Sequence, residues 1–166
     1  MGEMDGRRAE APAPTLTIQE LEARIGEEIG ISAWRELRQI DIDSFADVTD
    51  DHQFIHVDQA RALAETPFGG TIAHGFLTLS LLSAFGQEAL PKIANRRMGV
   101  NYGFERVRFL SPVRSGARVR ARFRLDRLER RRANEVLLGY AVTIEIEGGQ
   151  KPALAALWLT LAVLES

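Results

Sequence analysis

The amino-acid sequence predicts an α+β fold in which a strongly bent antiparallel sheet surrounds one long central helix. Residues 71–89 are apolar over most of a helical circumference, so this helix must be enclosed on most sides. The C-terminal half instead alternates apolar and polar residues with a period of two, as half-buried antiparallel strands do. A single sheet that curls around a single helix satisfies both requirements.

Length and composition indicate one globular domain. The chain has 166 residues, of which 45% are hydrophobic and 27% are charged. Residues 1–14 are rich in Gly, Pro, Ala and charged residues that pack poorly, so we expect a disordered lead-in before a domain at residues 15–166. The formal net charge of −2 gives no basic field that would attract nucleic acid.

The chain contains no cysteine, which excludes disulfides, thiolate nucleophiles and Cys-ligated zinc. This is compatible with a cytoplasmic location, which we expect. The longest nearly apolar stretch, residues 71–85, is shorter than the ~20 residues that span a bilayer, so we expect no membrane span. The N-terminus lacks the apolar region of a secretory signal.

The elements of the N-terminal half are predicted from caps and breakers. Thr17 and Glu20 form a capping box for a helix that runs to about residue 28. Residues 33–40 are predicted to form a first strand, and Asp43 to cap a short helix at residues 44–48. Residues 49–56 are expected to form an irregular polar loop. A second short helix follows at residues 59–64, before glycines break the chain ahead of the long helix.

The elements of the C-terminal half are predicted from alternation. Strands are expected at about residues 99–108, 117–125, 136–146 and 157–163, with a hairpin turn within 129–134 and another at Gly148-Gly149. The hairpin register that keeps the apolar faces together pairs Phe123 with Tyr140, Val119 with Ile144 and Arg118 with Glu145. The arginine cluster at the hairpin tip, residues 127–132, is interpreted as solvated, with phosphate contact as the alternative.

The main chemical signal is a cluster of all three histidines, His52, His56 and His74, near several aspartates. Asp51 and His56 lie five residues apart in the predicted loop, which lets their side chains converge on one water and shuttle its proton. Two alternatives remain open on spacing alone. The pair could simply satisfy the loop, or it could bind zinc or iron, although no tight ligand pattern supports a metal and we expect none.

The second signal is the run of glycines and small residues at residues 67–75, which leads into the long helix. Free backbone N–H groups at a helix start can bind an oxyanion, whereas the alternative is glycine used only for turn geometry. His74 is expected to order the start of the helix, and His52 to face solvent. Ser83 could project into a cleft, but helical serines are mostly structural.

The two segments together resemble the MaoC-like dehydratase family, also called hydratase 2. The sequence TDDHQFIH at residues 49–56 is similar to the family's S-G-D-x-N-P-I-H loop, and AHGF at residues 73–76 is similar to its helix start. The branch that contains nodulation protein N and small mycobacterial 3-hydroxyacyl-thioester dehydratases fits best. This chain departs from the family at Asp50, Gln53 and Phe54. The resemblance covers roughly residues 35–165.

The resemblance implies a single hotdog fold, usually a homodimer, in which Asp51 and His56 hold the catalytic water. Gly75 N–H is implied as the oxyanion donor, and Ser83 matches a position near the site. His74, Gln53 and Phe54 are further candidates for substrate contact. The implied reaction is reversible hydration of a trans-2-enoyl thioester to an (R)-3-hydroxyacyl thioester. It needs no metal or organic cofactor, and coenzyme A or acyl carrier protein enters only as part of the substrate.

Two other functions remain open from sequence. A hotdog thioesterase would share the fold and the acyl-CoA ligand, but its acidic residue commonly lies on the long helix. Glu88 is the only acid in residues 71–90, and it lies near the far end. A non-catalytic module that binds an acyl thioester or a partner protein is the second possibility, against which the intact Asp51, His56 and Gly75 set argues.

Overall fold

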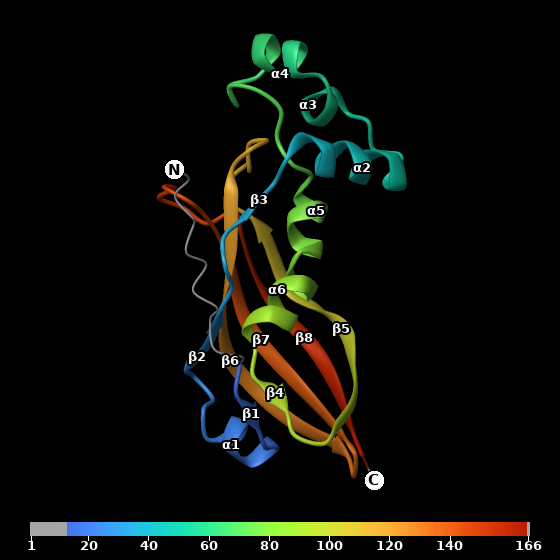
Figure 1. The fold of residues 1–166 in the computed structure, drawn as a ribbon, viewed down its shortest axis with the longest axis vertical. Helices are drawn as coiled ribbons and strands as arrows, with labels where there is room; N and C mark the ends of the chain where they lie inside the picture. Colours follow the sequence, from blue (N-terminus) through green and yellow to red (C-terminus); the bar gives the residue numbers. More distant parts are fainter. Residues whose placement is uncertain (1–12, 166) are drawn as a thin grey trace, which may run out of the picture.

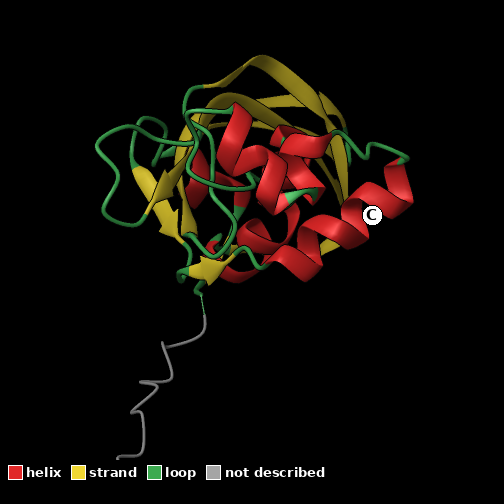
Figure 2. Cartoon of the chain, turned by 90° about the horizontal axis from the view of Figure 1, so that it is seen from above, coloured by secondary structure: helices red, strands yellow, loops and turns green. Residues whose placement is uncertain are grey.

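The computed structural model describes residues 13–165 and is built around a curved antiparallel sheet (Figure 1). The sheet has six strands, and its order is β2-β6-β7-β8-β5, with β3 also paired to β6. The strands are β2 (Glu28–Ile31), β3 (Arg35–Glu36), β5 (Arg96–Phe109), β6 (Arg118–Arg132), β7 (Glu135–Ile146) and β8 (Leu154–Leu164). Seen from above, the strands arch over the helices, as the alternation and the apolar helix together predict (Figure 2).

The helices and two short strands complete the fold. The short strands β1 (Thr15–Leu16) and β4 (Lys92–Ile93) pair with each other in parallel. The helices are α1 (Ile18–Glu22), α2 (Gln39–Thr49), α3 (Phe54–Val57), α4 (Gln59–Glu65), α5 (Gly75–Ser80) and α6 (Leu82–Ala89). In the described residues, no helix is long and apolar enough to cross a bilayer. Residues 1–12 of the expected lead-in lie outside the described part, whereas the carbonyl of Pro14 accepts from Lys92 N–H (2.9 Å).

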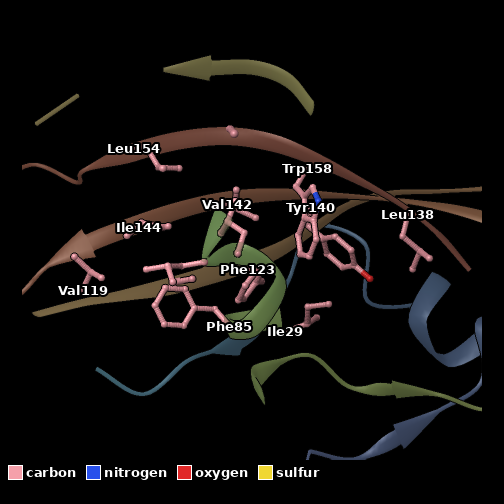
Figure 3. Close-up of a cluster of buried hydrophobic side chains, with 14 of the residues drawn as sticks. Ile29, Phe85, Val119, Phe123, Leu138, Tyr140, Val142, Ile144, Leu154 and Trp158 are labelled. Carbon is pink, nitrogen blue, oxygen red and sulfur yellow. The ribbon is translucent and has the colours of Figure 1, made fainter. Parts of the chain in front are cut away.

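The core lies between the inner face of the sheet and helices α5 and α6 (Figure 3). The alternating residues of β6 behave as predicted, because Val119, Ala121, Phe123 and Leu125 are fully buried while the arginines between them reach the outer face. Phe85 of α6 packs into this layer. The burial of apolar side chains by both layers is what holds the sheet against the helices.

The predicted hairpin register is wrong by two residues. Val119 pairs with Ile146, Phe123 with Val142, Leu125 with Tyr140 and Arg120 with Glu145, and Arg118 instead bonds Glu147. A shift of two leaves every side chain on its predicted face, so the alternation could not distinguish the two registers. The observed register follows from a longer hairpin, in which β6 runs to Arg132 and turns at residues 133–134.

The long central helix is shorter than predicted and is divided. Residues 71–74 are extended, because Ala73 N–H donates to Val113 (2.7 Å) and Ser115 N–H donates to Thr71 (2.9 Å). The helix therefore begins at Gly75, and Leu81 separates α5 from α6, next to a Ser80 hydroxyl that bonds the Leu77 carbonyl. One side of α5 and α6 is buried and the other is exposed, so the helix is not enclosed all round.

Three N-terminal predictions are also wrong. The first helix ends at Glu22 rather than at about residue 28, where β2 begins. Within residues 33–40 the only strand is the two-residue β3, and α2 already starts at Gln39 instead of residue 44. The early start of α2 is explained by an unusual cap. The Asp41 carboxylate accepts hydrogen bonds from the backbone N–H (3.2 Å) and the guanidinium of Arg38. The Thr17–Glu20 capping box and the helix at residues 59–64 are confirmed.

Candidate active site

Three polar side chains meet at the start of α5. Asp51, His56 and His74 each offer a nitrogen or oxygen atom, and these atoms lie within 4.8 Å of one another. Asp51 follows α2, His56 lies in the one-turn helix α3, and His74 directly precedes α5. The predicted convergence of Asp51 and His56 is therefore present in the structure, with His74 as a third member.

Local backbone geometry and a glutamine place the loop that carries the first two residues. Asp50 ends α2 in the left-handed conformation (φ 58°), which turns the chain sharply before Asp51. The Gln39 amide then donates to the carbonyl of His56 (2.7 Å), and its oxygen accepts from the Thr71 hydroxyl (2.6 Å). This bridge ties α2, α3 and the segment before α5 together, so the three site residues are held by one network.

The hydrogen bonds of His56 determine which ring nitrogen is available for chemistry. Its Nδ1 lies 2.7 Å from the carbonyl oxygen of Ile72, which can only accept, so Nδ1 carries the proton. In the neutral ring, Nε2 then has a free lone pair. Burial lowers the pKa of His56, an effect that the bond to Ile72 and the charge of Asp51 partly oppose. The neutral, proton-accepting form is therefore favoured.

His74 contacts both other members of the site. Its Nε2–H donates to the backbone carbonyl of Asp51 (2.9 Å), and its ring stacks on that of His56 with centroids 3.8 Å apart. The Phe45 ring covers it at 5.0 Å. The Nδ1 atom of His74 is buried and has no hydrogen-bond partner among the described residues. His74, which we expected to order the start of the helix, thus also contacts the loop that carries Asp51.

The Asp51 carboxylate remains accessible. The side chain is 53% exposed, and one carboxylate oxygen lies 4.0 Å from Nε2 of His74. One water with hydrogen bonds of about 2.8 Å can bridge two polar atoms that lie within 4.8 Å of each other, which is the separation of an Asp51 oxygen and a ring nitrogen of His56. The arrangement can therefore activate a water by general acid–base chemistry.

An apolar pocket of about 380 Å³ adjoins this cluster. His56, Gly75 and Thr78 line it together with Phe76 and Phe109, whose rings pack edge to face at 5.8 Å. A Cβ atom at Gly75 would come within 2.9 Å of the Phe109 ring, so only glycine allows this close approach. The pocket has the apolar walls and few polar groups that are typical of small-molecule sites.

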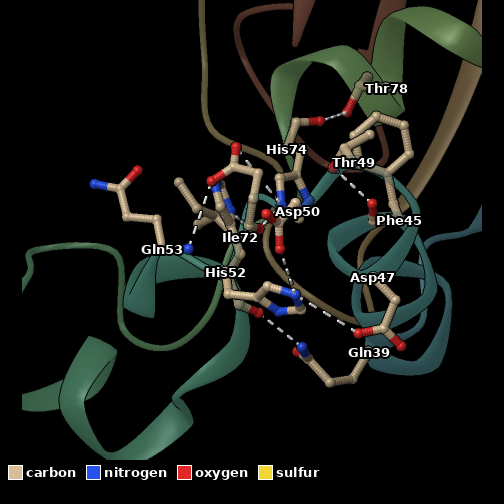
Figure 4. A network of polar contacts seen from close by, with 12 residues as sticks. Gln39, Phe45, Asp47, Thr49, Asp50, His52, Gln53, Ile72, His74 and Thr78 are labelled. Atoms are coloured by element: carbon tan, nitrogen blue, oxygen red, sulfur yellow. Dashed lines mark hydrogen bonds and ion pairs between the residues drawn. The ribbon is translucent and has the colours of Figure 1, made fainter.

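Other predicted site residues lie apart from the pocket. Ser83 lines a separate hollow between α6 and strands β5 and β8. Phe54 carries the Arg61 guanidinium 4.0 Å over its ring, and neither Phe54 nor Gln53 lines the pocket of His56. His52 is half exposed beside Asp47 and Asp50, as expected (Figure 4).

Sequence reasoning missed the pocket wall formed by residues 109–113, at and after the end of β5. Phe109 is the clearest of these, because it is 50% exposed although it is a large apolar residue. The only sequence signal was the apolar pair Phe109-Leu110 running into Ser111-Pro112, which ends a strand. That signal does not indicate that Phe109 packs against α5.

The same three side chains are the ones that could hold a metal. Two histidines, each anchored through one nitrogen to a backbone carbonyl, and one carboxylate are ligand types that zinc and iron use. The geometry serves a bound water equally well, so the expectation of no metal stays a prediction.

A curved antiparallel sheet around a helix, with a cluster of polar side chains and an apolar pocket at the start of that helix, is the arrangement of a hotdog-fold protein. The family described as MaoC like domain matches residues 20–146, and the chain belongs to this family. The hotdog fold predicted from the resemblance is confirmed.

Relatives and solved structures agree with this family. The chain is 54% identical to nodulation protein N of Rhizobium leguminosarum bv. viciae, over 88% of this chain and 91% of that protein. It is 43% identical to 3-hydroxyacyl-thioester dehydratase Z of Mycobacterium tuberculosis, over 84% and 91%. The R-hydratase PhaJ1 from Pseudomonas aeruginosa is 27% identical with a TM-score of 0.66, over 89% of this chain and 85% of that one.

Proposed function

We propose that this protein catalyses the reversible hydration of a trans-2-enoyl-CoA to an (R)-3-hydroxyacyl-CoA. The observation that carries the proposal is the approach of the Asp51 carboxylate and a ring nitrogen of His56 to within 4.8 Å beside an apolar pocket. Support comes from relatives named as a 3-hydroxyacyl-thioester dehydratase and an R-hydratase. The reaction needs no metal or organic cofactor, and coenzyme A enters only with the substrate.

The proposed step assigns one task to each group. Asp51 accepts a proton from the water that His56 orients, and the water oxygen forms the new C–O bond at C3. The electrons of the C2=C3 bond move toward the thioester oxygen, where the Gly75 N–H would stabilise the enolate charge. The dyad returns the proton to C2 on the face that the water attacked, so addition is syn and atoms balance.

A thioesterase is not favoured by the structure. The Glu88 carboxylate, the only acid in residues 71–90, accepts a hydrogen bond from Ala33 N–H (2.8 Å) at the far end of α6. Glu88 does not line the pocket and does not belong to the cluster of Asp51, His56 and His74. Its hydrogen bond to Ala33 indicates a structural role. Loss of enoyl absorbance from crotonyl-CoA without release of free thiol distinguishes hydration from thioester hydrolysis.

Asp51→Asn tests the proposal. The amide keeps the size of the side chain but cannot accept the water proton, so turnover of crotonyl-CoA should fall by about 10²–10⁴-fold. Asp47→Asn is the matched control, because Asp47 belongs to the same acidic stretch, is 77% exposed and lines no part of the pocket. Chiral analysis of the product should find the (R)-alcohol. An Asp51→Asn protein that folds and keeps wild-type turnover contradicts the proposed dyad.

We further propose that the protein acts as a homodimer formed through the edge strand β5. This strand is 14 residues long and pairs only with β8 among the described residues. It exposes the apolar side chains of Met98, Val100, Tyr102 and Phe109. A long edge with open backbone groups and exposed apolar residues favours pairing with a second copy.

A further inference from the structure

A second hollow lies on the inner side of the sheet, between α6 and the strands β5 and β8. Its volume is about 540 Å³. Ser83 and Gln87 of α6 line one side, and Arg96 and Asn101 of β5 line the other. Among the described residues, none lines both this hollow and the apolar pocket of His56. The hollow is therefore separate from the candidate active site.

Two glycines make room on the walls of this hollow. At Gly86 of α6, an added Cβ atom would lie 3.0 Å from the Trp158 ring, so only glycine allows the helix to approach β8 this closely. At Gly99 of β5, an added Cβ atom would lie 3.6 Å from the Arg96 guanidinium. The Arg96 side chain thus lies along its own strand, and its charged end is next to the hollow.

The floor of the hollow contains two buried aromatic side chains with polar tips. Tyr140 and Trp158 are each 5% exposed, and their rings lie 6.0 Å apart (Figure 3). The indole N–H of Trp158 donates to Oδ1 of Asn101 (2.8 Å), so the NH₂ group of Asn101 keeps its donors for another partner. Burial raises the pKa of Tyr140 to about 12, although a hydrogen bond with Thr160 and the charge of Arg96 oppose this effect. The Tyr140 hydroxyl therefore keeps its proton at neutral pH.

The charged side chains of the hollow are both cations. They are Lys92 and Arg96, and no Asp or Glu from the described part of the chain lines the hollow. Within residues 13–165, neither cation forms an ion pair. The other polar lining groups are neutral and each has a hydrogen to donate: Ser83, Gln87, Asn101, Tyr140 and Thr160. Two cations without an anion, together with neutral donors, favour a negatively charged ligand.

Apolar groups line the rest of the hollow. They come from the end of α6, from the residues that follow it and from β8: Leu90, Pro91, Ile93, Trp158 and Leu161. An inorganic anion would leave these groups in contact with water, whereas an apolar body would cover them. A ligand that uses the whole hollow therefore combines an anionic group with a short apolar body.

We propose that this hollow binds a small organic carboxylate with a short apolar body. Arg96 pairs with the carboxylate, because the planar guanidinium matches the two carboxylate oxygens. Lys92 adds positive charge, and the NH₂ group of Asn101 is a further donor. The apolar body lies on the side of Trp158. This site goes beyond the proposed hydration, since it lies outside the pocket of His56 and its ligand carries no thioester.

Trp158 provides a local readout of binding. The chain has two tryptophans, so Trp34→Phe leaves Trp158 as the only indole. Hexanoate titrated into this full-length variant should change the Trp158 emission to saturation, and calorimetry should give the same Kd. Hexanamide has the apolar body without the charge, and inorganic phosphate has the charge without the body. Both should bind roughly tenfold more weakly than hexanoate, because each loses one of the two contributions.

A double variant in the Trp34→Phe background tests the two cations. Lys92→Gln/Arg96→Gln removes both charges at exposed positions and should bind hexanoate roughly tenfold more weakly. Arg97→Gln is the matched control, since Arg97 is an exposed arginine of the same strand that does not line the hollow, and it should bind hexanoate as the parent does.

Four results would overturn the inference. They are hexanoate binding of equal strength in the double variant and the control, hexanamide or phosphate binding as tight as that of hexanoate, binding heat without a change in Trp158 emission, and the absence of any saturable signal. The readouts do not require turnover, so they give the same answer whether or not the protein hydrates crotonyl-CoA.

Discussion

His74 holds both members of the proposed dyad, although it carries out no step of the proposed reaction. Its Nε2–H fixes the backbone of Asp51, and its ring supports His56 from one side. Its burial against Phe45 keeps that ring in place. A residue that contacts two catalytic groups in this way acts by positioning, and small displacements of such groups reduce rates strongly.

Two substitutions separate the two contacts of His74. His74→Phe keeps a stacked ring but removes the donor to Asp51, so kcat should fall about 10- to 100-fold with little change in KM. His74→Gln retains a donor without the ring and should recover part of the loss. The pH profile of kcat/KM should also move in His74→Gln, where His56 loses its stacked neighbour. Wild-type kcat in His74→Phe would show that the hydrogen bond to Asp51 is dispensable.

The pKa of His56 predicts how stability depends on pH. Burial lowers this pKa in the folded state below its value in the unfolded chain. Between the two values the unfolded chain binds more protons, so the free energy of unfolding should fall as pH decreases below about 6.5. The loss should level off below the folded-state pKa. Urea unfolding from pH 8 to pH 5 should show this decline in the wild type.

His56→Gln supplies the comparison for that experiment. The variant cannot titrate at this position, so its decline in stability over the same pH range should be smaller. His52→Gln is the matched control, because it removes an imidazole at a half-exposed position outside the pocket. Parallel pH curves for wild type and His56→Gln would mean that another group determines the dependence.

The candidate dyad could be predicted from sequence because its parts are local. Asp51 and His56 lie five residues apart, and the motif places His74 and Gly75 a short distance downstream. Phe109 could not be predicted as a pocket residue, since its contact with Gly75 depends on how β5 ends against α5. Ser83 shows the converse error, in which a position inferred from a resemblance lines a different hollow.

At the scale of elements, contact between β2 and α6 depends on one glycine. A Cβ atom at Gly30 would lie 2.4 Å from the carbonyl oxygen of Ala89, which is backbone and cannot rotate away. Gly30→Ala should therefore push β2 from α6 and lower the free energy of unfolding by about 1–3 kcal/mol. Gly99→Ala in β5 is the control, because its Cβ would be 3.6 Å from a flexible arginine. Equal stability of both variants would refute this packing argument.

The elements themselves were predictable where periodicity was strong. The alternation of β6 and β7 fixed which residues face the core, but it left the register free to shift by two. The turn at residues 133–134 and the bulge near Asp126 decide the register, and the turn contains no glycine that would mark it. The start of α2 was missed because Arg38 caps it instead of the usual Ser, Thr, Asp or Asn.

At the scale of the whole molecule, one edge of β5 has no neighbouring strand among the described residues, so its backbone N–H and C=O groups on that side are unpaired. The strand lies at the edge of the sheet (Figure 1). Its last residue, Phe109, lines the pocket. Antiparallel pairing of β5 with its copy would form a two-fold symmetric interface and join two sheets into one. Such pairing would bring the partner close to each pocket, where it could shield a bound substrate from bulk solvent.

Val100→Asp tests this assembly at the middle of the edge. The wild type should sediment as two 18.5-kDa chains, whereas a buried, like-charged pair at the interface should shift the variant to a monomer. Val48→Asp introduces the same charge at an 86% exposed site on α2 and should remain dimeric. Activity should fall with dimer content in Val100→Asp, because the pocket loses its covering. A monomeric wild type, or a Val100→Asp protein that stays dimeric, would place any contact between copies elsewhere than on β5.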